Sequence, residues 1–405
     1  MPNQGYPLSG VRVLDLTRYE AGPTCTLLLA FLGAEVIKVE SAREGYAQRR
    51  LFHEKGSKED LYFILLNLNK KSITLDLKHD RARFLLEKIL HYSDVLVESF
   101  GSEKLARMGL GYERMQELNP KLIVASISGY GSSGPYANYP SLDMTAQAMG
   151  GIMSLTGEEG QPPLRCGVTV ADSAGGANLA LGIVAALYRR EKTGLGGRVE
   201  VSLQDTALGL GRSILGTHIA YGSTARRSGN RLKDVVPWDI YAARDGWVAV
   251  CVIPNRLFER LMQAIGGERI LKSHNVRTIE DRVRHRALID GLLKEWVSRR
   301  DRFEVMKVLG EQGIPCGAVL DSDHIRHDPH VQERNMLVEI EHPEWGPVQV
   351  VGCPIKFPGE SELLRCSPGL GQHTREILFT ILGVSPEDAE LLEKEGAVGA
   401  SAEVR

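Results

Sequence analysis

Short apolar runs alternate with stretches of helical pattern over the first two hundred residues of this chain. Residues 11–16 and 35–39 have the composition of buried strands, and the apolar stretch 24–32 between them is typical of a helix. The alternation continues downstream, with a helical pattern at 81–92 and strands at 95–97, 122–126 and 199–202. Strands joined by crossover helices pair in parallel. The sequence therefore predicts an α/β fold built on an open, doubly wound (Rossmann-like) parallel sheet.

Chain length and a change in composition predict a second domain. The chain has 405 residues, which exceeds the usual size of a domain with a single hydrophobic core. Around residues 225–231 the sequence becomes basic and glycine-bearing, and a helical segment at 256–265 and a charged stretch at 277–302 follow. We expect a large domain over residues 1–224, a smaller α+β domain over 225–330 and a last segment at 331–405.

Composition and local motifs exclude several classes of protein. A net charge of −2 provides no general attraction for nucleic acid or for an anionic membrane. The first predicted strand leads into residues 17–23 and not into a G-x-G-x-x-G turn, so NAD binding is not expected. Six dispersed cysteines without a C-x-x-C pair predict neither a disulfide framework nor a thiolate zinc site.

Two further segments are interpreted as ordinary structure. The histidine-bearing run 324–330 contains a proline and lacks an E-x-x-H frame, so we expect no metal site there. Residues 129–135 are glycine-rich but lack the Lys-Ser/Thr ending of a phosphate loop, which favours a flexible active-site loop. The amino-terminal residues do not resemble a signal peptide, and the apolar stretch 179–187 is shorter than a bilayer span. These observations predict a soluble, cytoplasmic protein.

Asp172 is the most informative single residue. It follows the strand-like run 167–171 and precedes the small residues 173–177, after which an apolar helix covers 178–188. A carboxylate at such a junction lies beside free backbone N–H groups and beside glycines that let a ligand approach. The residues alone leave two interpretations open. Asp172 is either a helix N-cap or a nucleophile.

Six linked segments resemble those of one enzyme family. They comprise TRYEAGPTC (17–25) with LGAEVIKVE (32–40), residues 61–63 with 67–72, 97–100 with 107–109, 171–173, 313–319 and 371–374. In order and spacing, the chain from about residue 8 to 374 resembles the family III CoA-transferases, the formyl-CoA transferase and carnitine CoA-transferase family. The resemblance implies that the chain after residue 330 returns to the large domain. It also implies two subunits interlocked as rings in a homodimer.

The resemblance further implies a site. Asp172 is expected to act as the nucleophile, forming an aspartyl anhydride and then an aspartyl-CoA thioester, with backbone N–H groups of Gly175 and Gly176 facing the oxyanions. Asp143 matches an acidic active-site position, with another helix N-cap as the alternative. The CoA thioester is a substrate, and no tightly bound cofactor is expected. The matching CoA-binding positions are Tyr19, Glu20, Ala21, Leu75, Lys78, Ser99, Phe100, Gly101, Arg107 and Met108.

Departures from the formyl-CoA transferase pattern bear on the acids that are used. Glu20 replaces an amide, Ser41 an arginine and Leu142 a tyrosine, and a tetraglycine loop has no counterpart near residue 230. This chain instead carries Arg226, Arg227, Arg231 and Lys233 in that region. They are candidates for the second carboxylate of a larger dicarboxylic acid, with a solvated surface loop as the alternative. Succinyl-CoA is the donor that we expect.

Two other functions remain as alternatives. An α-methylacyl-CoA racemase needs an acid and a base at the substrate α-carbon, but Leu142 stands where the racemase pattern has a histidine, and residues 253–255 lack its glutamate. The second alternative is a CoA-binding subunit of a heteromeric transferase. The presence of Asp172 argues against a subunit without catalytic activity.

Overall fold

The computed structural model describes residues 5–41, 45, 49–50, 60–359 and 363–399, and it divides into two compact units. The first unit contains Met1–Ile152, Arg165–Gly222 and Glu333–Arg405, and the second contains Met153–Leu164 and Ser223–Gln332. Residues 153–164, which lie inside the predicted large domain, thus belong to the second unit. Each unit has its own hydrophobic core.

The first unit is built on a six-stranded sheet in which every pair of neighbouring strands is parallel. Its strands are β1 (Arg12–Leu16), β2 (Glu35–Glu40), β3 (Lys71–Thr74), β4 (Val95–Glu98), β5 (Ile123–Ser128) and β6 (Gly197–Ser202). The predicted strands agree with these bounds to within two residues; for β3 the sequence indicated only a strand end at 75–78, just after the observed strand. The predicted parallel α/β sheet is confirmed.

The strand order, β3-β2-β1-β4-β5-β6, reverses direction between β1 and β4. Val13 pairs with Val36 on one side of β1 and with Val95 on the other. Loops that leave the carboxyl ends of β1 and β4 therefore run away from each other and open a crevice. Ligands of doubly wound sheets bind at such a point. By this rule, the crevice is expected between the loop after Leu16 and the loop after Glu98.

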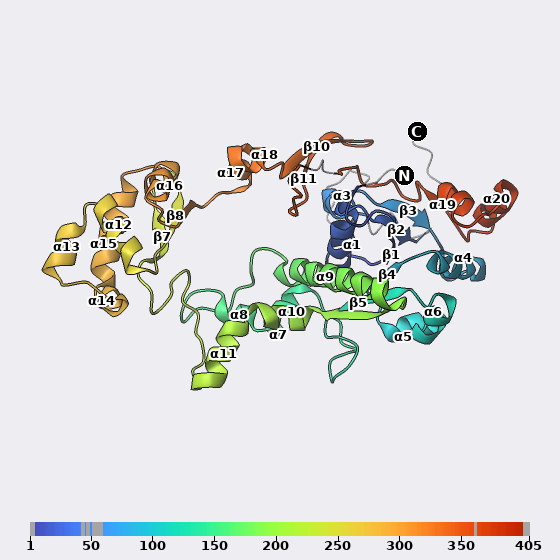
Figure 1. Ribbon diagram of the computed structural model, residues 1–405, viewed down its shortest axis with the longest axis horizontal. Coiled ribbons are helices and arrows are strands. Elements are labelled where there is room, and N and C mark those ends of the chain that lie inside the picture. Colours follow the sequence, from blue (N-terminus) through green and yellow to red (C-terminus); the bar gives the residue numbers. More distant parts are fainter. Residues whose placement is uncertain (1–4, 42–44, 46–48, 51–59, 360–362, 400–405) are drawn as a thin grey trace. The chain divides into compact units, whose positions relative to one another are not determined.

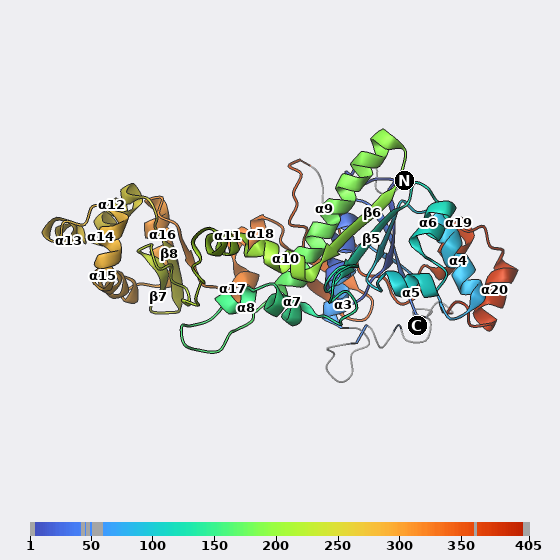
Figure 2. The same cartoon turned by 90° about the horizontal axis from the view of Figure 1, so that it is seen from below.

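Helices cover both faces of the sheet, as Figure 1 and Figure 2 show. Successive β1 residues point to opposite faces, so Val13 packs in one core and Leu14 in the other. The Val13 face is covered by α1 (Ala21–Phe31), α7 (Asp143–Met149), α9 (Val170–Thr193) and α10 (Leu203–Leu210). The Leu14 face is covered by α4 (Asp80–His91), α5 (Ser102–Arg107), α6 (Tyr112–Leu118), α19 (Thr374–Thr380) and α20 (Pro386–Lys394).

Helix α9 corrects one local prediction. The run 167–171 is not a buried strand, because α9 begins at Val170 and the preceding Val168 is exposed. Asp172 is therefore inside the first helical turn, two residues after the first, and Thr169 occupies the N-cap. The N-cap interpretation of Asp172 is wrong. Among the described residues, α9 is the one helix long and apolar enough to cross a membrane, but its buried residues pack on the sheet as those of a core helix do. A cytoplasmic location remains a prediction.

Other elements of the first unit lie outside these layers. Helix α3 (Leu61–Leu66) and the antiparallel hairpin of β10 (Leu337–His342) and β11 (Gly346–Val351) share a small core with Phe31. Helix α8 (Ile152–Leu155) spans the boundary between the two units, and α11 (Arg212–Tyr221) follows α10. No residue of α11 is buried.

The second unit combines a three-stranded antiparallel sheet with helices around it. The sheet is formed by β7 (Trp238–Ala242), β8 (Trp247–Cys251) and β9 (Cys316–Ala318), in that order. Its core includes residues of α12 (Asn255–Ala264), α14 (Ile279–Arg284), α15 (Arg286–Ser298) and α16 (Arg302–Glu311), with α13 (Glu268–Ser273) between α12 and α14. Helix α17 (Ser322–His327) and most of α18 (Pro329–Glu333) end the unit.

Candidate active site

Asp143 and Asp172 meet at the amino-terminal end of α9. Asp143 is the first residue of α7 and is buried, and its Oδ1 accepts hydrogen bonds from the backbone N–H of Ala171 (2.8 Å) and of Asp172 (3.3 Å). Gln147, one turn further along α7, donates to Asp143 Oδ2 (2.6 Å) and fixes its orientation. The alternative interpretation predicted that Asp143 caps its own helix, but its side chain does not do so. It satisfies free N–H groups at the start of another helix.

Glu20 brings a third carboxylate to the same place. It occupies the N-cap position of α1, but its side chain does not cap that helix. Its Oε1 instead accepts hydrogen bonds from the hydroxyls of Thr169 and Ser173 (3.0 Å for Ser173), which flank Asp172 in sequence. Its Oε2 accepts from the hydroxyl of Tyr62 on α3 (3.1 Å). Glu20, predicted as a CoA-binding residue, therefore lies beside Asp172.

The electrostatics of the cluster act mainly on Asp172. Burial, together with the neighbouring Asp143 and Glu20, raises the pKa of Asp172 to about 7. The positive end of a helix normally favours a carboxylate. Here two of the α9 N–H groups are bonded to Asp143 instead. Burial and the nearby Glu20 and Asp172 also raise the pKa of Tyr62, so its hydroxyl keeps its proton and donates to Glu20.

Gly175 and Gly176 allow α9 to pack closely against its neighbours. A Cβ added to Gly176 would lie 2.5 Å from the carbonyl oxygen of Ala21, and one added to Gly175 would lie 3.0 Å from Leu203 Cδ2. The absence of side chains here lets the first turn of α1, next to Glu20, approach α9. That their N–H groups also stabilise an oxyanion remains a prediction.

The loops after β1 and β4 carry a second group of residues, at the expected crevice of the sheet. Glu98, at the end of β4, accepts the N–H groups of Phe100 (2.7 Å) and Gly101 (3.0 Å) and so shapes the turn into α5. The ammonium of Lys104 lies 4.4 Å from the centre of the Phe100 ring, and the guanidinium carbon of Arg18 lies 5.8 Å from it. Cations beside an aromatic ring suit the phosphates and base of a nucleotide.

The predicted CoA-binding residues take different positions around this edge. Arg107 is exposed in the last turn of α5, and Met108 ends that helix. Tyr19 is exposed with a positive φ of 63°, and Lys78 is exposed after β3, whereas Leu75 is part of the core. The segment 18–20 connects the Phe100 loop with the carboxylate cluster, because Arg18 lies near the Phe100 ring and Glu20 near Asp172. Ser99 lies at the carboxyl end of β4, and Ala21 begins α1.

Sequence reasoning missed three residues of this edge. Tyr62 and Arg18 fall inside matched segments, so the motifs contained them, but nothing singled them out as site residues. Lys104 faces Phe100 because it lies one helical turn after Gly101, and the helical spacing around 102–107 is the signal that points to it.

The basic cluster of the second unit is mostly engaged by its own chain. Arg227 donates to the carbonyl oxygens of Ser154 (3.4 Å) and Gln161 (2.6 Å), and Arg231 forms an ion pair with Asp239 at 2.6 Å. The side chain of Arg226 is 83% exposed and lies 4.0 Å from Glu159. Arg226 is thus the most accessible of the three predicted arginines. Leu142, the other substrate candidate, is exposed next to Asp143.

No metal centre accompanies these residues in the part of the chain that the structure describes. No group of three His, Cys, Asp or Glu side chains there could hold a metal ion. In the histidine-bearing run, the His324 ring is bonded to Asp321 at 2.6 Å and the His327 ring to the carbonyl of Asp323 at 2.9 Å.

Comparison with known proteins identifies the family. The profile of CoA-transferase family III matches residues 8–374. A formyl-CoA:oxalate CoA-transferase from Rhodopseudomonas palustris (strain BisA53) is 38% identical, covering 96% of this chain and 97% of the relative. One from Streptomyces avermitilis is 36% identical, covering 96% and 99%. Among solved structures, a CAIB/BAIF family protein from Brucella suis aligns with a TM-score of 0.82 and 32% identity, over 93% of this chain and 100% of that one.

The fold, the site and these likenesses define an enzyme that transfers CoA, with an acyl-CoA and a carboxylic acid as substrates. The chain belongs to CoA-transferase family III.

Proposed function

We propose that the enzyme transfers CoA between two carboxylic acids through covalent intermediates on Asp172. One observation carries this proposal. In the described part of the chain, no group donates a hydrogen bond to the Asp172 carboxylate, whereas Asp143 and Glu20 each accept several. A carboxylate that must attack a thioester has to be reachable and uncommitted. Of the three, Asp172 alone meets this condition.

The reaction then proceeds through four balanced exchanges. The ionised Asp172 attacks the thioester carbonyl of the donor, the C–S bond breaks, and CoA leaves as its thiolate, so that a mixed anhydride forms. The thiolate attacks the aspartyl carbonyl of this anhydride, which releases the donor acid and leaves an aspartyl-CoA thioester. The acceptor carboxylate attacks that thioester and expels the thiolate again, giving a second anhydride. The thiolate finally attacks the acceptor's carbonyl and regenerates Asp172. Every intermediate retains the activation of the thioester.

The arrangement of the crevice suits the two halves of an acyl-CoA. Arg18 and Lys104 supply positive charge beside Phe100, and Arg107 adds an exposed cation in the last turn of α5, at the end that would hold the nucleotide. The thioester would reach Asp172 along the segment that ends at Glu20. A dicarboxylate is the acceptor that we propose, with succinyl-CoA as donor. Oxalate, named in the relatives' activity, is itself a dicarboxylate. Arg226 is the exposed cation that would receive the second carboxylate.

We also propose that the enzyme works as a homodimer. Large apolar side chains on α9 and α11 are exposed, including Leu181 (69% exposed), Tyr188 (65%), Ile219 (75%) and Tyr221 (81%). Large apolar surfaces of this kind usually contact another chain. A second copy in an interlocked ring is the partner that the family resemblance implies, and a different subunit is the alternative. Light scattering on the purified chain, with a CoA-transfer assay on the same sample, distinguishes the two.

The intermediate provides the decisive test. The enzyme is incubated with succinyl-CoA alone and digested, and the mass of the peptide that contains Asp172 is measured. We expect that peptide to carry CoA as a thioester that hydroxylamine removes. Asp172→Ala provides the control and should carry none. CoA on another residue, or transfer that survives in the Asp172→Ala variant, would overturn the proposal. A matrix of acyl-CoA donors, including formyl-CoA, against free acids then identifies the acids by product mass.

A further inference from the structure

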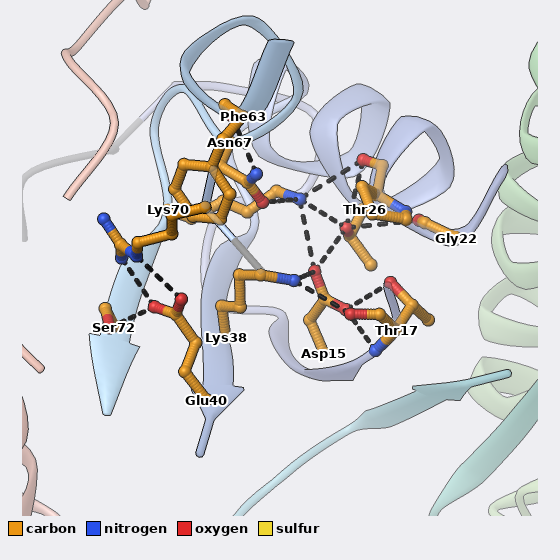
Figure 3. Close-up of polar contacts among 12 residues, drawn as sticks. Asp15, Thr17, Gly22, Thr26, Lys38, Glu40, Phe63, Asn67, Lys70 and Ser72 are labelled. Atoms are coloured by element: carbon orange, nitrogen blue, oxygen red, sulfur yellow. Dashed lines mark hydrogen bonds and ion pairs between the residues drawn. The ribbon is translucent and has the colours of Figure 1, made fainter. Parts of the chain in front are cut away.

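A buried cluster of charged side chains lies under the loop between β1 and α1, outside the carboxylate site (Figure 3). Lys70 Nζ is 3.2 Å and Lys38 Nζ 3.8 Å from Asp15 Oδ2, and all three side chains are buried. Burial lowers the pKa of Lys70 to about 8, which leaves it charged at neutral pH. Although burial opposes it, the two lysines hold the pKa of Asp15 well below its usual range. Buried ion clusters are costly compared with an apolar core, and none of these groups takes part in the proposed reaction steps.

The cluster first fixes the start of the loop. Asp15 Oδ1 accepts both the N–H (2.8 Å) and the hydroxyl (2.6 Å) of Thr17. Lys38 donates to the carbonyl oxygen of Thr17 (2.9 Å). Gly22 closes over the Thr17 side chain, since a Cβ at Gly22 would lie 2.3 Å from Thr17 Cβ. The backbone and side chain of Thr17 are therefore both held.

Lys70 fixes the far end of the loop and also α3. Its ammonium donates to the carbonyl of Pro23 (3.2 Å) and to the Thr26 hydroxyl (2.8 Å), both in α1. The Thr26 hydroxyl in turn donates to Asp15 (2.7 Å). Lys70 also donates to Asn67 Oδ1 (2.9 Å), the residue that ends α3. Figure 3 shows Lys70 between these groups from three separate segments.

We infer that Lys70 and Asp15 are positioning residues for the active site, which hold the Glu20 carboxylate and the Tyr62 hydroxyl in place beside Asp172. The inference rests on the proposed function of Asp172. The loop is anchored at Thr17 and at Pro23, and Glu20 lies between the anchors. Tyr62 belongs to the helix that Lys70 fastens through Asn67. Both partners of the Glu20–Tyr62 hydrogen bond are thus tied to one ammonium group.

The loop between the anchors needs such support. Tyr19 has a φ of +63°, in the left-handed region that side chains other than glycine seldom adopt. Such a conformation persists only where the surroundings impose it. When an anchor is lost, Glu20 is expected to move away from Thr169 and Ser173, and water to reach Asp172. Both changes lower the pKa of Asp172 toward that of an ordinary aspartate.

The test compares three variants of the full-length enzyme. Lys70→Met removes the ammonium, Thr26→Val removes one hydroxyl at nearly constant shape, and Thr26→Ser keeps that hydroxyl. We measure kcat against pH, and separately the pH dependence of carbodiimide labelling at Asp172, read from the mass of its peptide. Lys70→Met and Thr26→Val are expected to lower kcat about tenfold or more and to move both pH midpoints down by about one unit. Thr26→Ser is expected to behave like the wild type. If Lys70→Met does not fold, the Thr26 pair decides.

Leu86→Ala is the control for a purely structural role. Leu86 is fully buried in α4 on the opposite face of the sheet, and its truncation lowers the melting temperature without touching the loop. Its pH midpoints should match the wild type. The inference is overturned if Lys70→Met and Thr26→Val keep the wild-type midpoints, or if Leu86→Ala shifts them equally. A wild-type enzyme that labels normally at Asp172 but exchanges no CoA contradicts the proposed function alone.

Discussion

Asp143 accepts the backbone N–H groups of Ala171 and Asp172, at 2.8 and 3.3 Å, and so occupies the amino-terminal N–H groups of α9 that would otherwise favour a charge on Asp172. Two acidic residues at one helix end therefore have different roles. Asp143 is bonded and oriented by Gln147, whereas Asp172 remains without a donor in the described part of the chain. The arrangement favours a reactive Asp172 over a structural one.

The replacement of Asp172 by alanine should abolish CoA transfer and leave the fold intact. A lost nucleophile costs several powers of ten in rate. The fold should be retained, because the Asp172 carboxylate accepts no hydrogen bond in the described part of the chain and its charge is unfavourable to folding. The measurements are the transfer rate and a urea unfolding curve. A variant that unfolds at lower urea but keeps its turnover would falsify the assignment of Asp172 as nucleophile.

The raised pKa of Asp172 also predicts how stability depends on pH. The pKa of Asp172 is about 7 in the folded state, against 3.8 for an ordinary aspartate, so between these pH values the folded state binds more protons than the unfolded state. The ionised carboxylate is therefore unfavourable to folding above neutral pH, and this contribution disappears as pH falls toward 4. Asp172→Asn should be more stable than the wild type at pH 8, on the order of 2–4 kcal/mol, and equally stable near pH 4.

Urea unfolding at the two pH values, at equal protein concentration, checks this stability prediction. A control is Glu35→Gln, at the opposite edge of the sheet, where ion pairs with Arg12 and Lys71 hold the pKa of Glu35 below its usual value in spite of burial. That variant should be less stable than the wild type at pH 8, and the difference should shrink as pH falls below 4.5, the usual pKa of a glutamate. The same sign for both variants would contradict the raised pKa of Asp172.

Local patterns in the sequence predicted the sheet but not the site's geometry. The apolar runs that became β1, β2, β4 and β5 are buried on both faces, which is why composition alone revealed them. The run 167–171 has the same composition, yet Val168 is exposed and α9 begins at Val170, because the cap for this helix comes from Asp143. A cap supplied by a residue 28 positions away leaves no local signal. For the same reason, the bond between Tyr62 and Glu20 required the fold.

Glu20→Gln should move the acid limb of the kcat/KM profile to lower pH. The neutral amide removes one of the two neighbouring charges that raise the pKa of Asp172, after burial, and it can still accept hydrogen bonds from Thr169 and Ser173. We expect a shift of about one pH unit in kcat/KM, which reports the free enzyme. Glu35→Gln, which is remote from Asp172, should leave the profile in place. A Glu20→Gln profile that overlays the wild type would show that Glu20 does not affect the ionisation of Asp172.

Arg107→Ala should raise the KM for the acyl-CoA donor about tenfold and leave kcat nearly unchanged. A contact with a distant phosphate is made equally in the ground state and the transition state, so its loss weakens binding without slowing the bound complex. Lys104→Ala should act in the same way, because Lys104 lies on the same helix as Arg107 and its ammonium contacts the Phe100 ring. Arg114→Ala, whose guanidinium pairs with Glu87, is the matched control on the neighbouring α6. A KM unchanged by both substitutions would remove α5 from the CoA site.

Arg226→Gln should impair dicarboxylate acceptors selectively. If this exposed guanidinium receives the second carboxylate, its loss costs about 1.5–3 kcal/mol in kcat/KM for dicarboxylates and leaves monocarboxylates unaffected, because only the former lose a charged hydrogen bond. Arg227→Gln is the matched control, since Arg227 holds the carbonyls of Ser154 and Gln161 and should lower stability and affect both acceptor classes alike. If the ion pair between Arg226 and the acceptor carboxylate stays exposed to solvent, it is screened and contributes little to binding. Equal losses for the two classes in Arg226→Gln would therefore assign the basic loop to solvent and leave the choice of acceptor to the residues around Asp143.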